Sequence, residues 1–314
     1  MEEEKLIMTD DYIQRLPENP IIEPEMEGLK GENGENINGP SIIKVPEWVE
    51  NPLGKYYLYF AHHGGNYIRL AYTDNLEGTW KIYAPGTLQL DQTVCESHVA
   101  SPDVHVDNKN QQIIMYFHGP SQTDGIYSDH GQLTYYATSK DGVNFEANSE
   151  VIAPFYFRGF KYNNNYYGIA KNKNTGGLLL RSPDPFTTFE YGKEFIDNMR
   201  HAAVLKKDNE LYVFYSRMRD KPERILMSKV NLNQDWLQWE PLSPVEILKP
   251  QKDYEGANLP VKKSRPGSIN NPVHQLRDPA VFEENNNIYI FYSVVGENGI
   301  AAAVLEKNDL KKLT

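Results

Sequence analysis

The residues of this sequence best suited to chemistry are histidines and aspartates that flank short apolar runs. His62 and His63 follow YYLYFA and precede two glycines, Asp103 stands in SPDVHVD, Asp278 in RDPAVF, and His201 near the start of RHAAVLK. Carboxylates and imidazoles are common proton donors and acceptors, so these residues indicate general acid-base chemistry. A structural interpretation also stands, because Asp-Pro commonly starts turns and the histidine pair with its glycines could be a polar hairpin.

The elements that would position these residues recur five times along the chain. Each repeat has a short β-type segment, a tight turn, an aromatic strand, a further strand, and an outer strand that carries Trp80, Phe145, Phe189 or Trp239 in the first four repeats. The repeats begin near Asn38, Ser101, Phe157, Arg200 and Arg277. No segment shows a sustained helical period. The repeats predict an all-β fold, a five-bladed β-propeller with four-stranded antiparallel blades.

The domain organisation follows from these repeats. Residues 36–314 form the predicted propeller, and a long insertion, residues 241–276, precedes the last blade and is expected to cover the mouth of the central channel. The fifth repeat lacks an outer strand. Residues 1–35 therefore either lead into the first blade or close the ring through NPIIEP, Asn19 to Pro24, and the sequence leaves both alternatives open.

Blade geometry brings certain polar residues together. In an antiparallel blade the start of strand one lies beside the end of strand two, so both face one end of the channel. The residues expected there are Asn38, His62, His63, Asp103, His118, Arg158, Lys171, His201, Arg217, Arg277 and Asp278. If Asp103 and Asp278 lie close together, the pKa of one should rise above that of the other, so that one acts as an acid and the other as a base. The four cations would either neutralise carboxylates or bind an anionic group of a ligand.

Composition excludes some partners. A formal net charge of -11 argues against nucleic acid or an anionic membrane as partner. The single cysteine, Cys95, rules out an intrachain disulfide and a cysteine-based zinc site. Met1 to Tyr12 is acidic and lacks the pattern of a signal peptide, and no later run could span a bilayer, so we expect a cytoplasmic protein. No cofactor is required, although the channel could hold a structural divalent cation. The sequence does not indicate an oligomeric state.

Several stretches of the sequence resemble those of a known superfamily. KYYLYFAHHGG, IRLAYTDNLEGTW, ASPDVHVD, ELYVFYSR and RDPAVF are similar to the five-bladed β-propeller glycosidases, which include family-43 arabinanases and β-xylosidases, fructosidases and neoagarobiose hydrolases. The resemblance starts near Asn19 and implies a glycosidase. The sequence departs from the arabinanase pattern where Asn38 and Gly39 replace Ala-Asp-Pro, and where His201 replaces a glutamate acid. Asp103 is similar to the second aspartate of that pattern, and neoagarobiose hydrolases use a histidine as proton donor.

These departures from the arabinanase pattern support a relocated catalytic set. Asp278 or Asp103 would be the base and His201 or Glu96 the acid, with Glu255 in the insertion as a further acid candidate. Inversion needs the two groups about 6.5–9.5 Å apart, with a water between base and sugar. We expect an exo-acting hydrolase that cleaves a short oligosaccharide in the central pocket. The alternatives are a glycoside phosphorylase, which needs one protein acid and a phosphate pocket, and a non-catalytic carbohydrate-binding propeller.

Overall fold

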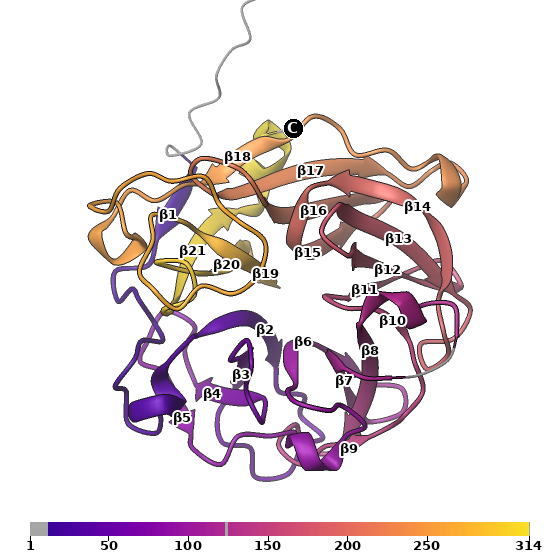
Figure 1. Cartoon of the computed structure of the whole chain (residues 1–314), viewed down its shortest axis with the longest axis horizontal. Coiled ribbons are helices and arrows are strands. Elements are labelled where there is room, and N and C mark those ends of the chain that lie inside the picture. Colours follow the sequence, from indigo (N-terminus) through magenta and orange to yellow (C-terminus); the bar gives the residue numbers. More distant parts are fainter. Residues whose placement is uncertain (1–11, 123–124, 314) are drawn as a thin grey trace, which may run out of the picture.

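Antiparallel sheets surround a central axis in the computed structural model, which describes residues 12–122 and 125–313 (Figure 1). Within those residues there are five sheets, and consecutive strands of the chain pair with one another from the axis outward. The first strands, β2, β6, β11, β15 and β19, lie beside the axis (Figure 1). The five-bladed all-β propeller predicted from the sequence is confirmed.

Blades one to three each run from an inner to an outer strand. Blade one comprises β2 (Asn38–Lys44), β3 (Tyr56–Ala61), β4 (Arg69–Thr73) and β5 (Lys81–Tyr83). Blade two comprises β6 (Ala100–Asp107), β7 (Gln112–Pro120), β8 (Gln132–Ser139), β9 (Glu146–Ala147) and β10 (Ala153–Pro154). Blade three comprises β11 (Arg158–Tyr162), β12 (Asn165–Asn172), β13 (Gly176–Ser182) and β14 (Glu190–Asp197). Blade two exceeds four strands because β9 and β10 both pair with β8.

Blades four and five complete the ring. Blade four comprises β15 (Met199–Lys207), β16 (Glu210–Arg217), β17 (Ile225–Asn231) and β18 (Val245–Leu248). Blade five comprises β19 (Arg277–Glu284), β20 (Asn287–Ser293), β21 (Ile300–Glu306) and β1 (Ile13–Arg15). The helical segments are short: η2 (Gly31–Gly34), η3 (Leu90–Gln92), η4 (Ser128–His130), η5 (Trp236–Gln238), η6 (Asp253–Glu255), α1 (Lys307–Leu310) and η7 (Lys311–Leu313). In the described part of the chain, no helix has the length and apolar character needed to cross a membrane.

The N-terminal segment supplies the outer strand of blade five. β1 pairs antiparallel with β21, with Ile13 opposite Leu305. The NPIIEP stretch adds only an isolated bridge between Ile22 and Ile300. Pairing of the first strand with the last blade protects the free edge and links the two ends of the chain. Residues 1–11, most of the stretch on which the expectation about a signal peptide depends, lie outside the described residues.

Aromatic side chains near the outer strands join neighbouring blades. Trp80 packs against Phe291 of blade five with ring centroids 6.3 Å apart, and Phe145 packs against Tyr59 of blade one at 6.0 Å. Trp239 packs against Tyr167 of blade three at 4.7 Å. Trp80 and Phe145 directly precede β5 and β9, and Trp239 lies farther from β18. The predicted place of these aromatics inside the outer strands was therefore wrong, because they turn inward between blades before the strand begins.

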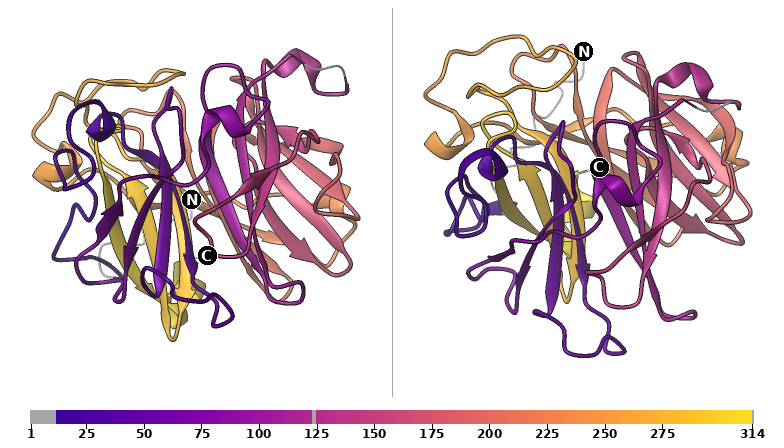
Figure 2. Two further views of the ribbon diagram at one scale, coloured as in Figure 1. Left: turned by 90° about the horizontal axis from the view of Figure 1, so that it is seen from below. Right: turned by 60° about the horizontal axis from the view of Figure 1, so that its bottom comes forward.

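The insertion before blade five is shorter than the sequence suggested. β18 lies within residues 241–276 and forms the outer strand of blade four. The remaining residues, 249–276, contain only η6 and form loops that rise above one end of the barrel (orange in Figure 2). We call residues 249–276 the lid segment.

Candidate active site

Four of the first strands begin with the same irregularity. The pairing register slips at the start of β2, β6, β15 and β19, which indicates a β-bulge. In β2, β6 and β19 a bulge residue has a left-handed backbone: φ is +62° at Gly39, +47° at Ser101 and +49° at Asp278. Such bulges redirect a side chain and are frequent beside active sites. These three residues are therefore equivalent, and of the three only Asp278 brings a carboxylate to the mouth of the channel.

Asp278 forms a buried pair with His201 of the neighbouring blade four. His201 Nδ1 contacts Asp278 Oδ1, and the two residues are only 4% and 2% exposed. Ser293 Oγ donates to Asp278 Oδ2 at 3.4 Å. His201 Nε2 lies 3.5 Å from Ser101 Oγ. A carboxylate at Nδ1 holds the proton on that nitrogen, so Nε2 is left to exchange a proton with a ligand.

The charges of this pair follow from its surroundings. Burial by itself would raise the pKa of Asp278, but His201 and the guanidinium groups of Arg277 and Arg200 outweigh burial and lower it to about 2. Burial lowers the pKa of His201 below the ordinary 6.5, although Asp278 acts in the opposite direction. Near neutral pH the carboxylate is therefore charged and the imidazole mostly neutral.

An aromatic wall adjoins the pair. The Tyr156 ring lies edge-on to His201, with centroids 3.7 Å apart, and also to His118, at 4.6 Å. Burial lowers the pKa of His118 well below 6.5, so this ring is neutral. Lys171 Nζ lies 5.1 Å from the Tyr156 ring centroid and 5.5 Å from that of Phe155. Burial, reinforced by the charge of Arg200, lowers the pKa of Lys171 to about 7.

An arginine precedes each member of the pair and holds a buried glutamate. Arg200 donates to both oxygens of Glu223, at 2.7 and 3.1 Å. Arg277 donates to Glu297 at 2.7 Å, and its Nε lies 3.5 Å from Glu223. Glu223 and Glu297 were missed at the sequence level because they lie in loops between strands two and three. Those loops begin at the strand-two ends, so their position in the repeat was a usable signal.

Blade one reaches the site through Glu297. Glu297 Oε2 accepts from Asn36 Nδ2 at 2.8 Å and lies 3.6 Å from His63 Nδ1. Asn36 Oδ1 in turn accepts from Asn38 Nδ2 at 2.6 Å. The structure thus brings together several of the residues named from the sequence: Asn38, His63, His118, Lys171, His201, Arg277 and Asp278.

Asp103 lies deeper in the channel than Asp278. Its Oδ2 accepts from His105 Nε2 at 2.8 Å and from the Gly159 amide at 2.7 Å, which links blades two and three. The depth follows from residue order, because Asp103 comes after the proline of SPDV whereas Asp278 precedes the proline of RDPA. Burial would raise the pKa of Asp103, but His105 and Arg158 lower it overall. Asp103 and Arg158 line a channel cavity of about 200 Å³.

The other residues named from the sequence lie outside this group. His62 Nδ1 accepts from the Gly64 amide at 2.9 Å, so it stabilises its own turn. Glu96 is exposed on a loop. Arg217 turns toward Asp220, at 3.3 Å, because strand alternation directs it away from the channel. Glu255 is fully buried between Arg15 Nε at 2.7 Å and the Tyr292 hydroxyl at 2.8 Å, so it anchors the lid segment to β1.

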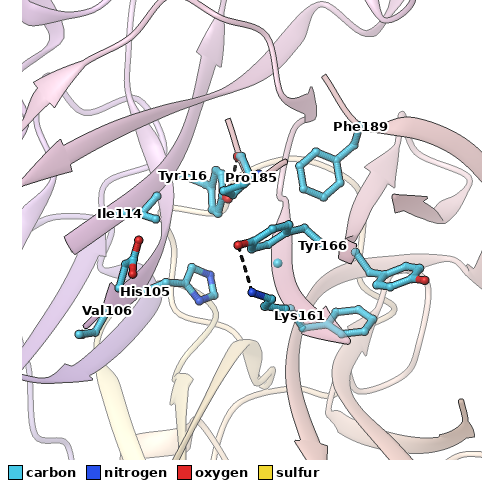
Figure 3. A pocket seen from close by; sticks show the side chains of 12 residues that line it. His105, Val106, Ile114, Tyr116, Lys161, Tyr166, Pro185 and Phe189 are labelled. Carbon is cyan, nitrogen blue, oxygen red and sulfur yellow. Dashed lines mark hydrogen bonds between the residues drawn. The ribbon is translucent and has the colours of Figure 1, made fainter. Parts of the chain in front are cut away.

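A second pocket lies between blades two and three (Figure 3). It measures about 240 Å³ and is lined by Tyr116, Tyr166, Lys161 and His105, among others. His105 is near the end of β6 and Tyr166 near the start of β12. This pocket therefore opens toward the opposite end of the barrel from the His201–Asp278 pair.

A structural divalent cation in the channel would need a cluster of ligands. Within residues 12–122 and 125–313, no three His, Cys, Asp or Glu side chains are grouped so that they could hold a metal ion.

Solved structures with this fold include enzymes that act on glycosides. A glycosyl hydrolase from Bacteroides ovatus matches with a TM-score of 0.65, 9% identity and coverage of 94% of each chain. An alpha-L-arabinofuranosidase from Lactobacillus brevis matches with a TM-score of 0.57 and 14% identity, over 95% of this chain and 93% of that one. A beta-1,2-mannobiose phosphorylase from Listeria innocua matches with a TM-score of 0.60 and 14% identity, over 96% and 99%. The chain thus has the fold of the five-bladed β-propeller glycosidases.

Sequence comparison gives a nearer relative. No protein-family model matches the chain. The uncharacterized protein R118 of Acanthamoeba polyphaga mimivirus is 37% identical over an alignment of 331 positions, which covers 94% of this chain and 91% of that protein. The chain therefore belongs to the same family as this mimivirus protein.

Proposed function

We propose that this protein cleaves a glycosidic bond at the mouth of its channel, with His201 as proton donor and Asp278 as the group that holds and charges it. The observation that carries the proposal is the buried contact between His201 and Asp278 at a bulge facing the channel. The fold shared with a glycosyl hydrolase and a mannobiose phosphorylase supports it.

The chemistry assigns one step to each group. His201 in its imidazolium form gives the Nε2 proton to the glycosidic oxygen as the bond from that oxygen to the anomeric carbon breaks. The negative charge of Asp278 stabilises the imidazolium, and Tyr156 keeps the ring in place. Water attacks the anomeric carbon in the hydrolytic version, so that its hydroxyl group goes to the sugar and its proton is released.

A phosphorylase is the second candidate, favoured by the state of the other carboxylates. His201 and Asp278 touch, so they cannot stand on either side of a sugar as the separate acid and base of an inverting hydrolase. Glu223 and Glu297, the other buried carboxylates at the mouth among the described residues, are held by arginines. Inorganic phosphate is already a nucleophile and needs no protein base.

Substrate size can be proposed from the lid segment. Its loops rise above the mouth at one side (Figure 2). These loops would hinder a long polysaccharide from lying across the channel. We propose exo action on a short oligosaccharide for this reason. The cytoplasmic location stays a prediction.

The test is product release from a panel of oligosaccharides, each offered with and without inorganic phosphate. We expect turnover by the parent and a loss of about 10²–10⁴-fold in His201→Gln and Asp278→Asn. Asp91→Asn, which changes an exposed carboxylate in η3, is the control and should match the parent. Dependence on phosphate would select the phosphorylase. Tight binding of a sugar without products would instead identify a carbohydrate-binding propeller and refute the enzyme.

A further inference from the structure

The lid segment and the loop around Lys221 enclose a hollow whose charged lining is entirely positive. The hollow measures about 950 Å³ and no Asp or Glu lines it. Its cations are Lys221, Lys262, Lys263, Arg265 and Arg277. In a chain with a net charge of -11, a concave surface of one positive sign is an exception to the overall composition.

Four of these cations are without an ion pair in the described part of the chain. Lys221, Lys262, Lys263 and Arg265 are exposed, and none forms an ion pair with a carboxylate of the described residues. Arg277 differs, since it is buried and bound to Glu297. Repulsion between neighbouring like charges costs free energy, and a bound anion would relieve it. A scattered solubilising surface would instead mix both signs.

The hollow adjoins the His201–Asp278 pair through the backbone. Arg200, directly before His201, donates to the Gly267 carbonyl oxygen at 3.1 Å and also to that of Arg265. Arg277, directly before Asp278, forms part of the wall of the hollow. The lid segment is thereby held over the two residues that we assign to the reaction.

We infer that this hollow binds an oxyanion, with Lys262, Lys263 and Arg265 as its principal contacts. The oxyanion is either free inorganic phosphate or an acidic group on the sugar, such as a carboxylate. Lysine and arginine bind both through charge-assisted hydrogen bonds. The place of this anion in a reaction rests on the proposed function, whereas its binding does not.

The experiment measures anion binding to the full chain by calorimetry, with inorganic phosphate, glucuronate and neutral glucose as ligands. We expect phosphate or glucuronate to bind at millimolar or lower concentration and glucose to bind more weakly. The triple variant Lys262→Gln/Lys263→Gln/Arg265→Gln should weaken anion binding by about tenfold or more, because it removes three charge-assisted hydrogen-bond donors. The control Lys55→Gln/Lys81→Gln/Lys109→Gln removes the same charge from exposed lysines elsewhere and should leave binding unchanged.

The calorimetry distinguishes free phosphate from an acidic sugar as the source of the anion. Phosphate binding without glucuronate binding identifies free phosphate, and preference for glucuronate identifies an acidic sugar. Absence of binding by both anions overturns the inference, and so does an equal loss in the control variant, which would show a long-range charge effect only. Binding requires no turnover, so a protein that binds the anion through these residues but cleaves nothing would contradict the proposed enzyme and leave the anion site standing.

Discussion

At the residue scale, the account depends on a carboxylate in a left-handed bulge. Asp278 has φ +49°, a conformation that costs a non-glycine residue of order 1 kcal/mol and persists when its surroundings fix it. His201, Arg277 and Ser293 supply those surroundings. The equivalent residues Gly39 and Ser101 carry no charge, so the repeat places a single carboxylate at this level.

Replacement of Asp103 should separate a structural from a catalytic carboxylate. We expect Asp103→Asn to keep turnover within about threefold of the parent, because its partners His105 and Gly159 link blades rather than face the mouth. Its free energy of unfolding should fall by about 1–3 kcal/mol, since a buried charged hydrogen bond is lost. Urea unfolding and turnover on one substrate test this. A loss of turnover as large as that of Asp278→Asn would show that Asp103 takes part in the reaction.

The pH profile tests the protonation state of His201. Its pKa lies below 6.5, so the donor form decreases as pH rises through that lowered value, while Asp278, with a pKa of about 2, stays ionised. Turnover limited by the donor should therefore be at least about tenfold lower near pH 7.5 than on an acidic plateau. The measurement is kcat/KM against pH. Activity that instead rises toward alkaline pH would indicate that neutral His201 acts as a base.

At the element scale, the lid segment and the ring closure meet at Glu255. This fully buried carboxylate joins η6 to Arg15 of β1 and to Tyr292 of β20. The amides of Gln251 and Lys252 donate to its second oxygen, at 2.7 and 3.1 Å. One carboxylate therefore joins blade five, its closing strand and the lid segment.

Loss of the Arg15 charge should weaken this junction. We expect Arg15→Gln to lower the free energy of unfolding by about 2–4 kcal/mol, because it leaves a buried carboxylate without its cation. The control Lys44→Gln, which removes an exposed lysine from its ion pair with Glu284, should cost less than about 1 kcal/mol. Denaturant unfolding measures both. Equal effects of the two variants would mean that the junction carries no special stability.

At the scale of the whole molecule, histidine burial should make stability depend on pH. Burial lowers the pKa of most shifted histidines in the described chain, namely His62, His98, His118, His130 and His201. The unfolded chain then binds more protons than the folded one below about pH 6.5, so acid favours unfolding. His105 is opposite, since Asp103 raises its pKa despite burial.

The opposite pKa shifts of His118 and His105 predict opposite effects when each is replaced. The free energy of unfolding should decrease from about pH 7.5 to about pH 5, by up to about 1.4 kcal/mol per pH unit for each extra proton. His118→Asn should flatten that dependence, and His105→Asn should steepen it. Chemical denaturation at several pH values measures the slope. Slopes that change in the same direction in both variants would contradict the assigned pKa shifts.

The repeated apolar runs of the sequence predicted the fold well, because each blade is formed by strands that follow one another in the chain. The blade starts near Asn38 and Arg277 were predicted at the residues where β2 and β19 begin. Contacts between loops were not predictable in the same way. The contact between Glu223 and Arg200 depends on how the loop after β16 folds back over the start of β15, and the depth of Asp103 depends on a bulge that alternation alone does not reveal.

The most direct test of the central claim is a crystal structure of Asp278→Asn with an oligosaccharide that the parent cleaves. The account predicts the sugar at the mouth of the channel, with the glycosidic oxygen within about 3.2 Å of His201 Nε2. A scissile bond in the pocket between blades two and three, or at the mouth but out of reach of His201, would contradict it.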